Sequence, residues 1–333
     1  MLDQLLPLDV FFALSVERYY KDRESCIGAS GDFITAPETS QMFCHAVGVW
    51  VYSQVSNFKG NISLVELGGG NGTMMNEILN LLKNEVIPQD VYFVETSSQM
   101  IKRQKNAVSS HIHTKFHWVN SIDEIPSNVK HIVLANEFFD ALPVKQFIAC
   151  DSCFREIYLS QELQLVQSQD VINNEEMSKI MQYSNLRVEN FNQDEIFELS
   201  TVSLSIIDKI CKISHAALII DYGYDNSQKK NTIKAIKNHT ILDSFLVTPG
   251  SADISAEVDF GAMQNFIHKN YSTFNINYTT QKDFLIHNHI EIIAEKARNH
   301  TKDQAKLDLI NSELHKISIE MGEKFKVLSM SEN

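Results

Sequence analysis

The sequence predicts an α/β fold: an open sheet of seven strands, with a helical extension before it and a subdomain inserted into it. Three observations support this expectation. A glycine-rich turn at 68–72 follows the first buried strand and precedes an amphipathic helix. The second strand ends in an acid, Glu95. Strand and helix patterns then alternate along the chain, until residues 146–213 interrupt them.

Composition narrows the classes of function. The chain has 333 residues, of which 44% are hydrophobic, so it can bury a substantial core. It has 29 basic and 42 acidic residues, a formal net charge of −13, and no cluster of lysine or arginine. Nucleic acid is not expected as a partner, because phosphate contacts need a concentrated basic face. Membrane insertion is not expected either, because no window is apolar enough to span a bilayer.

Cysteine usage and the first residues predict the compartment. Five cysteines are an odd number, which argues against a disulfide framework. Cys150 and Cys153 have redox-motif spacing, but no second pair completes a zinc site, and no metal is expected. Residues 1–9 lack the basic start of a signal or transit peptide. We therefore expect a reduced, cytoplasmic setting.

The segment before the glycine turn is expected to be helical. Residues 9–20 have a helical pattern rich in aromatics, and residues 41–58 form an amphipathic pattern that leads into the first strand. Between them, the polar loop 28–40 carries Asp32 and Glu38. The loop is either an ordinary connection between helices or a lid over a ligand, and the residues alone leave both open.

The glycine turn indicates a nucleotide-type cofactor. Residues 64–73 are Leu-Val-Glu-Leu-Gly-Gly-Gly-Asn-Gly-Thr, in which a buried strand passes into glycines. These glycines let the backbone approach a ligand without a Cβ in the way. Residues 74–82 continue with helical spacing. An acid at the tip of the second strand, Glu95, can accept both hydroxyl hydrogens of a ribose.

The spacing of the glycines favours one cofactor class. Gly68, Gly70 and Gly72 form G-x-G-x-G, whereas dinucleotide sites want G-x-G-x-x-G. Glu66 stands two residues before the first glycine, as in many S-adenosylmethionine sites, where the acid organises the loop near the methionine moiety. We therefore favour a methyltransferase over a nicotinamide- or flavin-dependent dehydrogenase. Ser121 lies where a contact to the adenine edge would fall.

The fourth strand, near 131–136, ends in polar side chains. Asn136, Glu137 and Asp140 follow it, and ligands of open α/β sheets bind at the carboxyl ends of strands. These residues are expected to face the reactive end of the cofactor; the alternative is that Asn136 or Asp140 caps a helix. The expected cofactor-binding residues are Glu66, Gly68, Gly70, Gly72, Thr73, Glu95, Ser121 and Asn136.

The rest of the chain completes the expected domains. Residues 146–213 contain a hairpin pattern over 155–166 and an amphipathic pattern near 196–213, and they are expected to cover the sheet. Further strands are expected at 216–224, 273–278 and 325–328. The expected division is 1–60 (helical extension and lid loop), 61–145 with 214–333 (core), and 146–213 (inserted cover subdomain).

Five segments resemble the MidA-like family: 31–38, 66–73, 136–144, 221–224 and 249–260. That family comprises S-adenosylmethionine-dependent methyltransferases whose mitochondrial members assist assembly of respiratory complex I. The resemblance implies a seven-stranded, Rossmann-like class I methyltransferase sheet and methylation of an arginine in a complex I (NADH dehydrogenase) subunit. Three positions depart from the family pattern: Gly69 and Asn71 stand where proline and arginine are common, and His289 stands where glycine is usual before Ile290.

An arginine substrate makes the acids candidate catalysts. A guanidinium is a poor nucleophile, because its lone pairs are delocalised and it stays protonated in water. Carboxylates can hold it bidentately, localise its charge and receive its proton. The expected catalytic residues are Glu137, Asp140, Asp32 and Glu38.

The substrate would be a protein that presents a flexible, arginine-containing segment. Two alternatives stay open: an assembly chaperone that binds S-adenosylmethionine without catalysis, and a small-molecule methyltransferase whose pocket is closed by residues 146–213. The sequence makes no prediction of oligomeric state.

Overall fold

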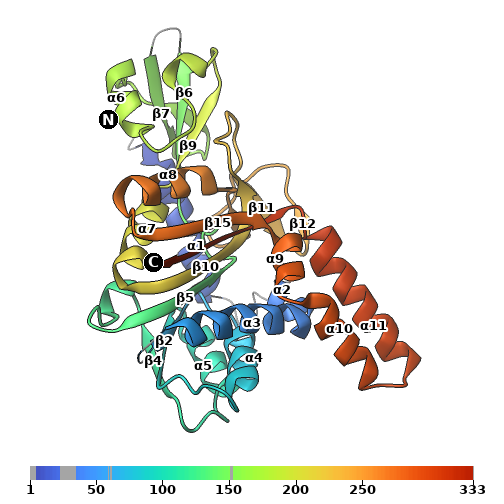
Figure 1. Ribbon diagram of the computed structural model, residues 1–333. Helices are drawn as coiled ribbons and strands as arrows, with labels where there is room; N and C mark the ends of the chain where they lie inside the picture. The colour runs from blue at the N-terminus through green and yellow to red at the C-terminus, as the bar shows by residue number, and fades with distance from the viewer. Residues whose placement is uncertain (1–4, 23–34, 59, 61, 151–152, 333) are drawn as a thin grey trace.

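The computed structural model describes residues 5–22, 35–58, 60, 62–150 and 153–332 of the chain (Figure 1). It confirms an α/β fold, in which helices pack on both faces of a large mixed sheet. The strand order is β15-β16-β10-β5-β2-β3-β4, and β14 pairs with the end of β10. Strands β4, β3, β2, β5 and β10 run parallel, whereas β16 is antiparallel to β10 and β15. Their bounds are β2 (Ile62–Leu67), β3 (Asp90–Val94), β4 (Lys115–Val119), β5 (Lys130–Asn136), β10 (Ser214–Tyr224), β14 (Val258–Asp259), β15 (Phe274–Thr280) and β16 (Phe325–Glu332).

Alternate residues of the central strands bury themselves in two separate apolar clusters, one on each face of the sheet. Leu64 and Leu134 pack with α3, α4, α9 and α10, whereas Val65 and Val133 pack with α7 and α8. A strand buried on both faces needs this nearly continuous apolar run. The helices are α3 (Gln41–Asn57), α4 (Thr73–Leu82), α5 (Ser98–Ala107), α7 (Thr201–Ile213), α8 (Phe260–Asn270), α9 (Gln281–His287) and α10 (Ile290–Asn299).

A second, smaller sheet lies at the top of Figure 1, beside the helix α6 (Asn174–Ile180). Its order is β1-β7-β6-β9, with β8 beside β7, and the antiparallel β7–β8 pair confirms the hairpin expected over 155–166. Cys150 and Cys153 face each other at the end of the β6–β7 hairpin as free thiols. The strands are β1 (Leu6–Pro7), β6 (Lys145–Cys150), β7 (Cys153–Leu159), β8 (Leu165–Gln167) and β9 (Ile196–Leu199).

The prediction of a helix near 196–213 is partly wrong. Residues 196–199 form β9, which pairs with β6 and buries Phe197 against Phe147. The helix α7 begins only at Thr201, where the Ser200 side chain accepts a hydrogen bond from the Ser203 amide and caps the helix. The prediction extended the apolar periodicity of α7 over residues 196–199. These residues form a strand because they pair with β6.

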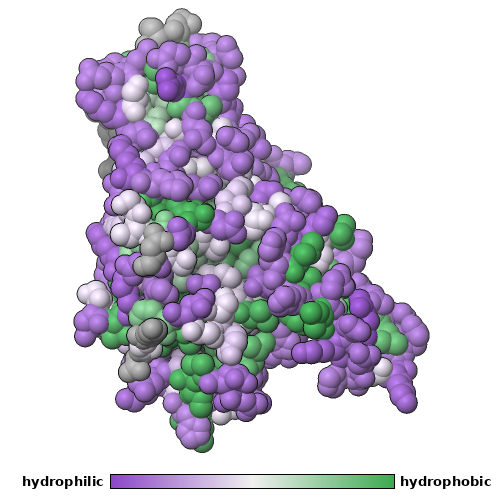
Figure 2. Space-filling model, viewed as in Figure 1, coloured by the Kyte–Doolittle hydropathy of each residue, from purple (hydrophilic) through white to green (hydrophobic). Residues whose placement is uncertain are grey.

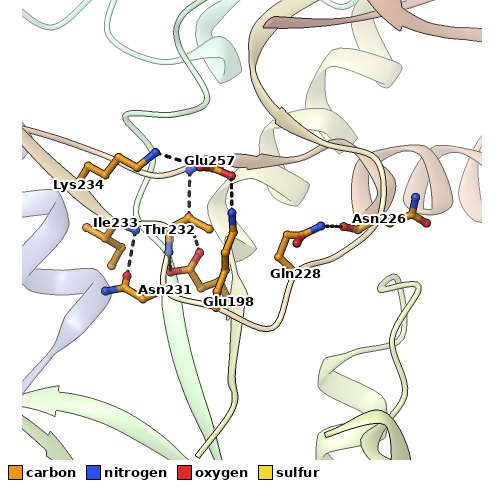
Figure 3. Close-up of polar contacts among 9 residues, drawn as sticks. Glu198, Asn226, Gln228, Asn231, Thr232, Ile233, Lys234 and Glu257 are labelled. Atoms are coloured by element: carbon orange, nitrogen blue, oxygen red, sulfur yellow. Dashed lines mark hydrogen bonds and ion pairs between the residues drawn. The ribbon is translucent and has the colours of Figure 1, made fainter. Parts of the chain in front are cut away.

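A buried carboxylate ties β9 to the core (Figure 3). Glu198 accepts hydrogen bonds from the Thr232 backbone amide at 2.9 Å, the Thr232 hydroxyl at 2.5 Å and the Gln146 side chain, through its Nε2, at 2.7 Å. The Thr232 hydroxyl in turn accepts from the Glu257 amide at 3.0 Å, and Glu257 pairs with Lys234. The second sheet is thus held against the segment that leads into β14.

The N-terminal helix packs between the second sheet and a third, three-stranded sheet. Helix α1 (Leu8–Asp22) packs its Leu8, Phe11 and Phe12 with β7 and with a three-stranded sheet of β12, β11 and β13. The short helix α2 (Ala36–Thr39) leads into α3. The strands of the three-stranded sheet are β11 (Lys234–Lys237), β12 (Thr240–Ile241) and β13 (Asp253–Ser255).

The C-terminal helices extend away from this body. Helix α11 (Gln304–His315) pairs with α10 as a hairpin that projects at the lower right of Figure 1. Hydrophilic residues cover most of the visible face of the molecule, and hydrophobic ones appear in separate groups (Figure 2). Among the described residues, no helix is both long enough and apolar enough to cross a bilayer.

Candidate functional site

A cavity of about 570 Å³ opens at the carboxyl ends of β2, β3 and β5. This is the edge at which open α/β sheets bind their ligands. Its walls come from the glycine turn, from the ends of β3 and β5, and from α1 and α2. The lining residues are Val16, Glu17, Tyr20, Lys21, Thr35, Pro37, Glu38, Glu66, Gly68, Gly69, Gly70, Asn71, Thr73, Met74, Glu95, Thr96, Ser97, Ser98, Met100, Asn136, Glu137, Phe138, Ala141 and Leu142.

The glycine turn has a backbone that other residues adopt at a cost. Gly68, Gly70 and Gly72 have φ values of 62°, 48° and 82°, so the predicted G-x-G-x-G spacing corresponds to three left-handed residues. A Cβ on Gly68 would also lie 2.8 Å from the Phe138 ring. The turn ends where Thr73 begins α4. Gly68 and Gly70 line the cavity, whereas Gly72 is not among its lining residues and packs against α5 instead.

Two buried acceptors in the cavity wall fit the amino end of S-adenosylmethionine. Glu66 is 2% exposed, and among the described residues its Oε2 atom has no hydrogen-bond partner; the same holds for Asn136 Oδ1. Unpaired buried acceptors cost free energy, so the pair favours a ligand that brings donors, such as an ammonium group. Burial, and secondarily the charge of Glu95, raises the pKa of Glu66 to about 8. A cation bound here would offset that cost.

Glu95 stands between this cavity and a second one. Its two carboxylate oxygens accept hydrogen bonds from the Ser97 amide at 2.8 Å and the Gln104 side chain at 3.2 Å, and burial raises its pKa. Both cavities are lined by Glu95 and Phe138, so they adjoin at the end of β3.

The second cavity, of about 500 Å³, contains Ser121. The Ser121 hydroxyl accepts a hydrogen bond from the Asp123 amide and caps the short helix η1 (Ile122–Glu124). Helix α7 contributes Thr201, Ser205 and Lys209 to the same wall, which no sequence motif indicated.

Glu137 lies at the turn after β5 and lines the first cavity. Its φ is 49°, an unfavourable value for a residue with a Cβ, and its amide donates to the Ile220 carbonyl at 2.9 Å. Its Oε1 accepts from the Ala36 amide at 3.0 Å and from Asn136 Nδ2 at 3.2 Å. Burial raises the pKa of Glu137 to about 7. A partly buried carboxyl on a strained backbone in a cavity wall is the strongest candidate for chemistry here.

Asp140 shares this turn but is not among the residues that line the cavity. It accepts a hydrogen bond from the Tyr222 hydroxyl, and burial raises its pKa to about 6. Its backbone carbonyl accepts from the Ala256 amide at 2.9 Å. Asp140 is therefore placed behind Glu137 rather than beside the space that a ligand could fill.

Asp221, at the end of β10, was not foreseen as a site residue. Its Oδ2 accepts from the Phe139 and Asp140 amides at 3.0 and 3.1 Å, and its Oδ1 accepts from the Tyr222 amide at 2.9 Å. It is fully buried, and burial together with the charges of Asp140 and Glu137 raises its pKa. Its position as an acid ending a buried strand was the available signal.

The expected lid residues are only partly within the described chain. Asp32 lies outside the described residues, whereas Glu38 lines the cavity. Glu38 accepts a hydrogen bond from the Thr73 hydroxyl at 2.6 Å, so these two expected site residues bind each other. With the Ala36–Glu137 contact, this attaches α2 to the cavity wall at two points, which favours the lid interpretation for residues 35–39.

Helix α1 also lines the first cavity, through Val16, Glu17, Tyr20 and Lys21. The aromatic, helical pattern of this segment predicted the helix but carried no signal that it would reach a ligand site. The Tyr20 carbonyl accepts a hydrogen bond from the Ser97 hydroxyl at 3.1 Å, which brings the end of α1 to the turn after β3.

Comparison with known proteins identifies relatives of this chain. A family model described as "Putative S-adenosyl-L-methionine-dependent methyltransferase" matches residues 46–277. The Caenorhabditis elegans protein arginine methyltransferase NDUFAF7 homolog, named as mitochondrial, is 30% identical over 340 residues, covering 94% of this chain and 78% of that protein. The human protein arginine methyltransferase NDUFAF7, also named as mitochondrial, is 26% identical over 355 residues, covering 94% and 76%.

A solved structure shares the fold. The crystal structure of a Burkholderia thailandensis protein bound to S-adenosyl-homocysteine superposes with a TM-score of 0.81 at 20% identity, covering 98% of this chain and 88% of that one. A native crystal structure from the same organism has a TM-score of 0.80.

The cytoplasmic setting expected from the sequence is wrong. The curated relatives are named as mitochondrial, which points to that organelle rather than to the cytoplasm. Free thiols such as Cys150 and Cys153 fit any reducing compartment, so cysteine usage could not distinguish the two.

The matches to the family cover most of the chain. The family model covers more than half of the chain, and the nematode relative aligns with nearly all of it. The glycine turn and the unpaired acceptors Glu66 and Asn136 lie inside the matched region and fit the cofactor of that family. The chain therefore belongs to the family of S-adenosylmethionine-dependent methyltransferases that includes the NDUFAF7 proteins.

Proposed function

We propose that this methyltransferase modifies an arginine side chain of a protein substrate and that, by resemblance, the substrate is a subunit of respiratory complex I. The observation that carries the proposal is Glu137, a partly buried carboxyl in the cavity wall whose hydrogen bonds within the described residues come from the Ala36 amide and Asn136 rather than from a lysine or arginine. A buried carboxylate without a cationic partner favours a cation from the substrate. The names of the curated relatives, which are protein arginine methyltransferases, support the same substrate class.

The cofactor residues follow from the cavity. We assign the methionine end to Glu66 and Asn136, with the turn of Gly68, Gly70, Gly72 and Thr73 as its floor. Glu95 would hold the ribose hydroxyls, and Ser121 would lie at the adenine edge. When bound, S-adenosylmethionine supplies a methyl group already activated by its sulfonium.

The residues around Glu137 would prepare the guanidinium. Glu137 accepts its N–H groups, draws its positive charge toward one side and takes the proton that the methylated nitrogen loses. A pKa of about 7 suits this duty, because the group can hold a proton and release it near neutral pH. Asp140 acts behind Glu137, and Glu38 closes the cavity from α2. Asp32 keeps its proposed catalytic role, although it lies outside the described residues.

We also propose the finer architecture expected from the sequence. The continuous path of strands from β15 to β4 supports a seven-stranded, Rossmann-like class I sheet. The separate sheet and apolar cluster between 145 and 199 support an inserted cover at 146–213, with 61–145 and 214–333 as the core. The extension at 1–60 is linked to that cover, because Leu6 pairs with Leu159.

Labelled methyl transfer tests the function. The purified protein is incubated with methyl-labelled S-adenosylmethionine and a cell extract, and the products are separated and hydrolysed to amino acids. Label in methylarginine of a discrete polypeptide is the expected result. Label only in small molecules would instead assign a small-molecule methyltransferase. Absence of label with retention of a bound partner would assign a non-catalytic chaperone.

Cofactor affinity is expected to rise with pH. Glu66 must ionise to bind an ammonium, and its pKa of about 8 in the free protein means that binding competes with its proton. The affinity for S-adenosylhomocysteine should therefore increase by up to ~10-fold per pH unit between ~6 and ~8. Calorimetry in buffers of different ionisation enthalpy should show proton release at pH ~7. An affinity independent of pH, or as steep in Glu66→Gln as in the wild type, would contradict this role.

The same shift predicts the stability of the free protein. The folded state binds the Glu66 proton more tightly than the unfolded chain does, because the pKa is raised from 4.5 to about 8. The free energy of unfolding should then fall as pH rises across that interval. Urea unfolding with and without S-adenosylhomocysteine should show that the ligand reduces this fall.

A further inference from the structure

We propose that Gln104 of α5 is a positioning residue that sets the spacing between the glycine turn and Glu95, and so aligns the two halves of the cofactor site. Gln104 is fully buried. Its Nε2 donates to the Gly70 carbonyl at 3.0 Å and to Glu95 Oε2 at 3.2 Å. One amide group thus connects the turn after β2 with the acid after β3. The inference rests on the proposed ribose role of Glu95.

Trp118 fixes the orientation of this amide. The indole Nε1 of Trp118 can only donate, and it lies 3.0 Å from Gln104 Oε1. The oxygen must therefore face Trp118, and the NH₂ group must face the two acceptors, the Gly70 carbonyl and the Glu95 carboxylate. The reversed amide would put donor against donor and acceptor against acceptor in a buried place, which is strongly unfavourable. Trp118 is itself held by stacking on Phe93, with an interplanar angle of 8°.

The consequence for Glu95 is a carboxylate with a single orientation. Gln104 holds Oε2, and the Ser97 amide holds Oε1 at 2.8 Å. The Thr96 amide also donates to this carboxylate, and Glu95 lines both cavities. A carboxylate fixed in this way can accept two hydroxyl hydrogens without losing side-chain entropy when the ligand binds.

The neighbours of Gln104 strengthen the connection to the glycine turn. The Arg103 guanidinium donates to Asn71 Oδ1 at 2.9 Å. A Cβ on Gly72 would lie 3.0 Å from the Gln104 Cα, so the helix backbone packs directly on the turn. Three successive residues of the turn, Gly70, Asn71 and Gly72, therefore contact one turn of α5.

A purely structural role for Gln104 makes a different prediction. A buried amide that only stabilises the fold would, when removed, weaken all ligands by the same factor or none. A positioning residue affects the part of the ligand that its partner contacts. The ribose hydroxyls therefore distinguish the two roles, since Glu95 is their expected acceptor.

The test compares two probes, S-adenosylhomocysteine and its 2′-deoxyribose analogue, by isothermal titration calorimetry. The wild type is expected to prefer the ribose form by ~10-fold or more, the value of one hydrogen bond to a charged acceptor. Gln104→Leu should weaken S-adenosylhomocysteine by ~10-fold or more and reduce the preference to about 2-fold or less, because Glu95 loses its fixed orientation.

Two further variants make the result decisive. Gln281 is also fully buried, and its Nε2 donates to the Ile317 carbonyl at 2.8 Å. It lines neither cavity, so Gln281→Leu should leave the preference for the ribose probe unchanged. Trp118→Phe keeps an aromatic ring but removes the donor that orients Gln104, so it should reduce the preference even if Gln104→Leu does not fold.

Equal weakening of both probes, or an unchanged affinity in Gln104→Leu and Trp118→Phe, would overturn the positioning role. A wild-type protein that binds neither probe would instead refute the cofactor site itself, and a wild type that binds both equally would refute the role of Glu95.

Discussion

Glu137→Gln is expected to lower the rate of methyl transfer by about 10³-fold, because it removes the carboxylate that receives the guanidinium proton. Glutamine keeps the size of the side chain and an oxygen that can accept from the Ala36 amide, so α2 should stay attached. The dissociation constant of S-adenosylhomocysteine should change by less than ~3-fold, since the lost group lies at the substrate end of the site. Single-turnover transfer of labelled methyl, together with calorimetry, measures both quantities.

Asp259 offers a matched control for Glu137. It is also partly buried, its pKa is likewise raised by burial to about 6, and its side chain accepts hydrogen bonds from Ser227 and from the Ala262 amide at the start of α8. It lines neither cofactor cavity. Asp259→Asn should therefore leave transfer within a few-fold of the wild type. Equal loss in both variants, or transfer retained in Glu137→Gln, would remove Glu137 from the mechanism.

Asp221→Ala is expected to reduce transfer by about 100-fold and to lower the free energy of unfolding by about 3 kcal/mol. The variant leaves the amides of Phe139, Asp140 and Tyr222 without their acceptor, and an unpaired buried donor costs ~1–3 kcal/mol. The turn that holds Glu137 at its left-handed φ would then relax. Urea unfolding and the transfer assay measure the two effects.

The amide variant separates position from stability. Asp221→Asn retains one oxygen that can accept from Phe139 and Asp140, so it should recover most of the stability and a large part of the transfer rate. Cofactor affinity should stay near the wild-type value in both variants, because Asp221 lines neither cavity. Cofactor binding that falls together with transfer would show a general collapse of the site rather than a displaced Glu137.

Local patterns in the sequence predicted the elements that carry the cofactor. Apolar residues with helical spacing predicted helices at 41–58 and 74–82, which the structure shows as α3 and α4 within one residue at each end. The G-x-G-x-G spacing predicted a strand-to-helix turn, and its three glycines do adopt left-handed conformations. The acids at the ends of β2, β3 and β5 were found by the same reasoning, because strand ends are defined locally. Extending α7 over 196–199 failed, since β9 exists only through its pairing with β6.

The tertiary structure alone decided which side chains meet. Glu38 binds Thr73, Asp221 holds the turn of Glu137, and Gln104 connects Gly70 with Glu95. It also placed Asp140 behind the cavity and brought α1 into the wall.

The sequence by itself therefore determined the strands of the large sheet, the glycine turn and the cofactor class, because backbone conformation and burial are encoded over a few residues. The tertiary structure decided the proton-accepting end of the site, where partners such as Ala36 and Glu137 are 101 residues apart. Contacts at that separation depend on how the layers pack, and no local pattern records them.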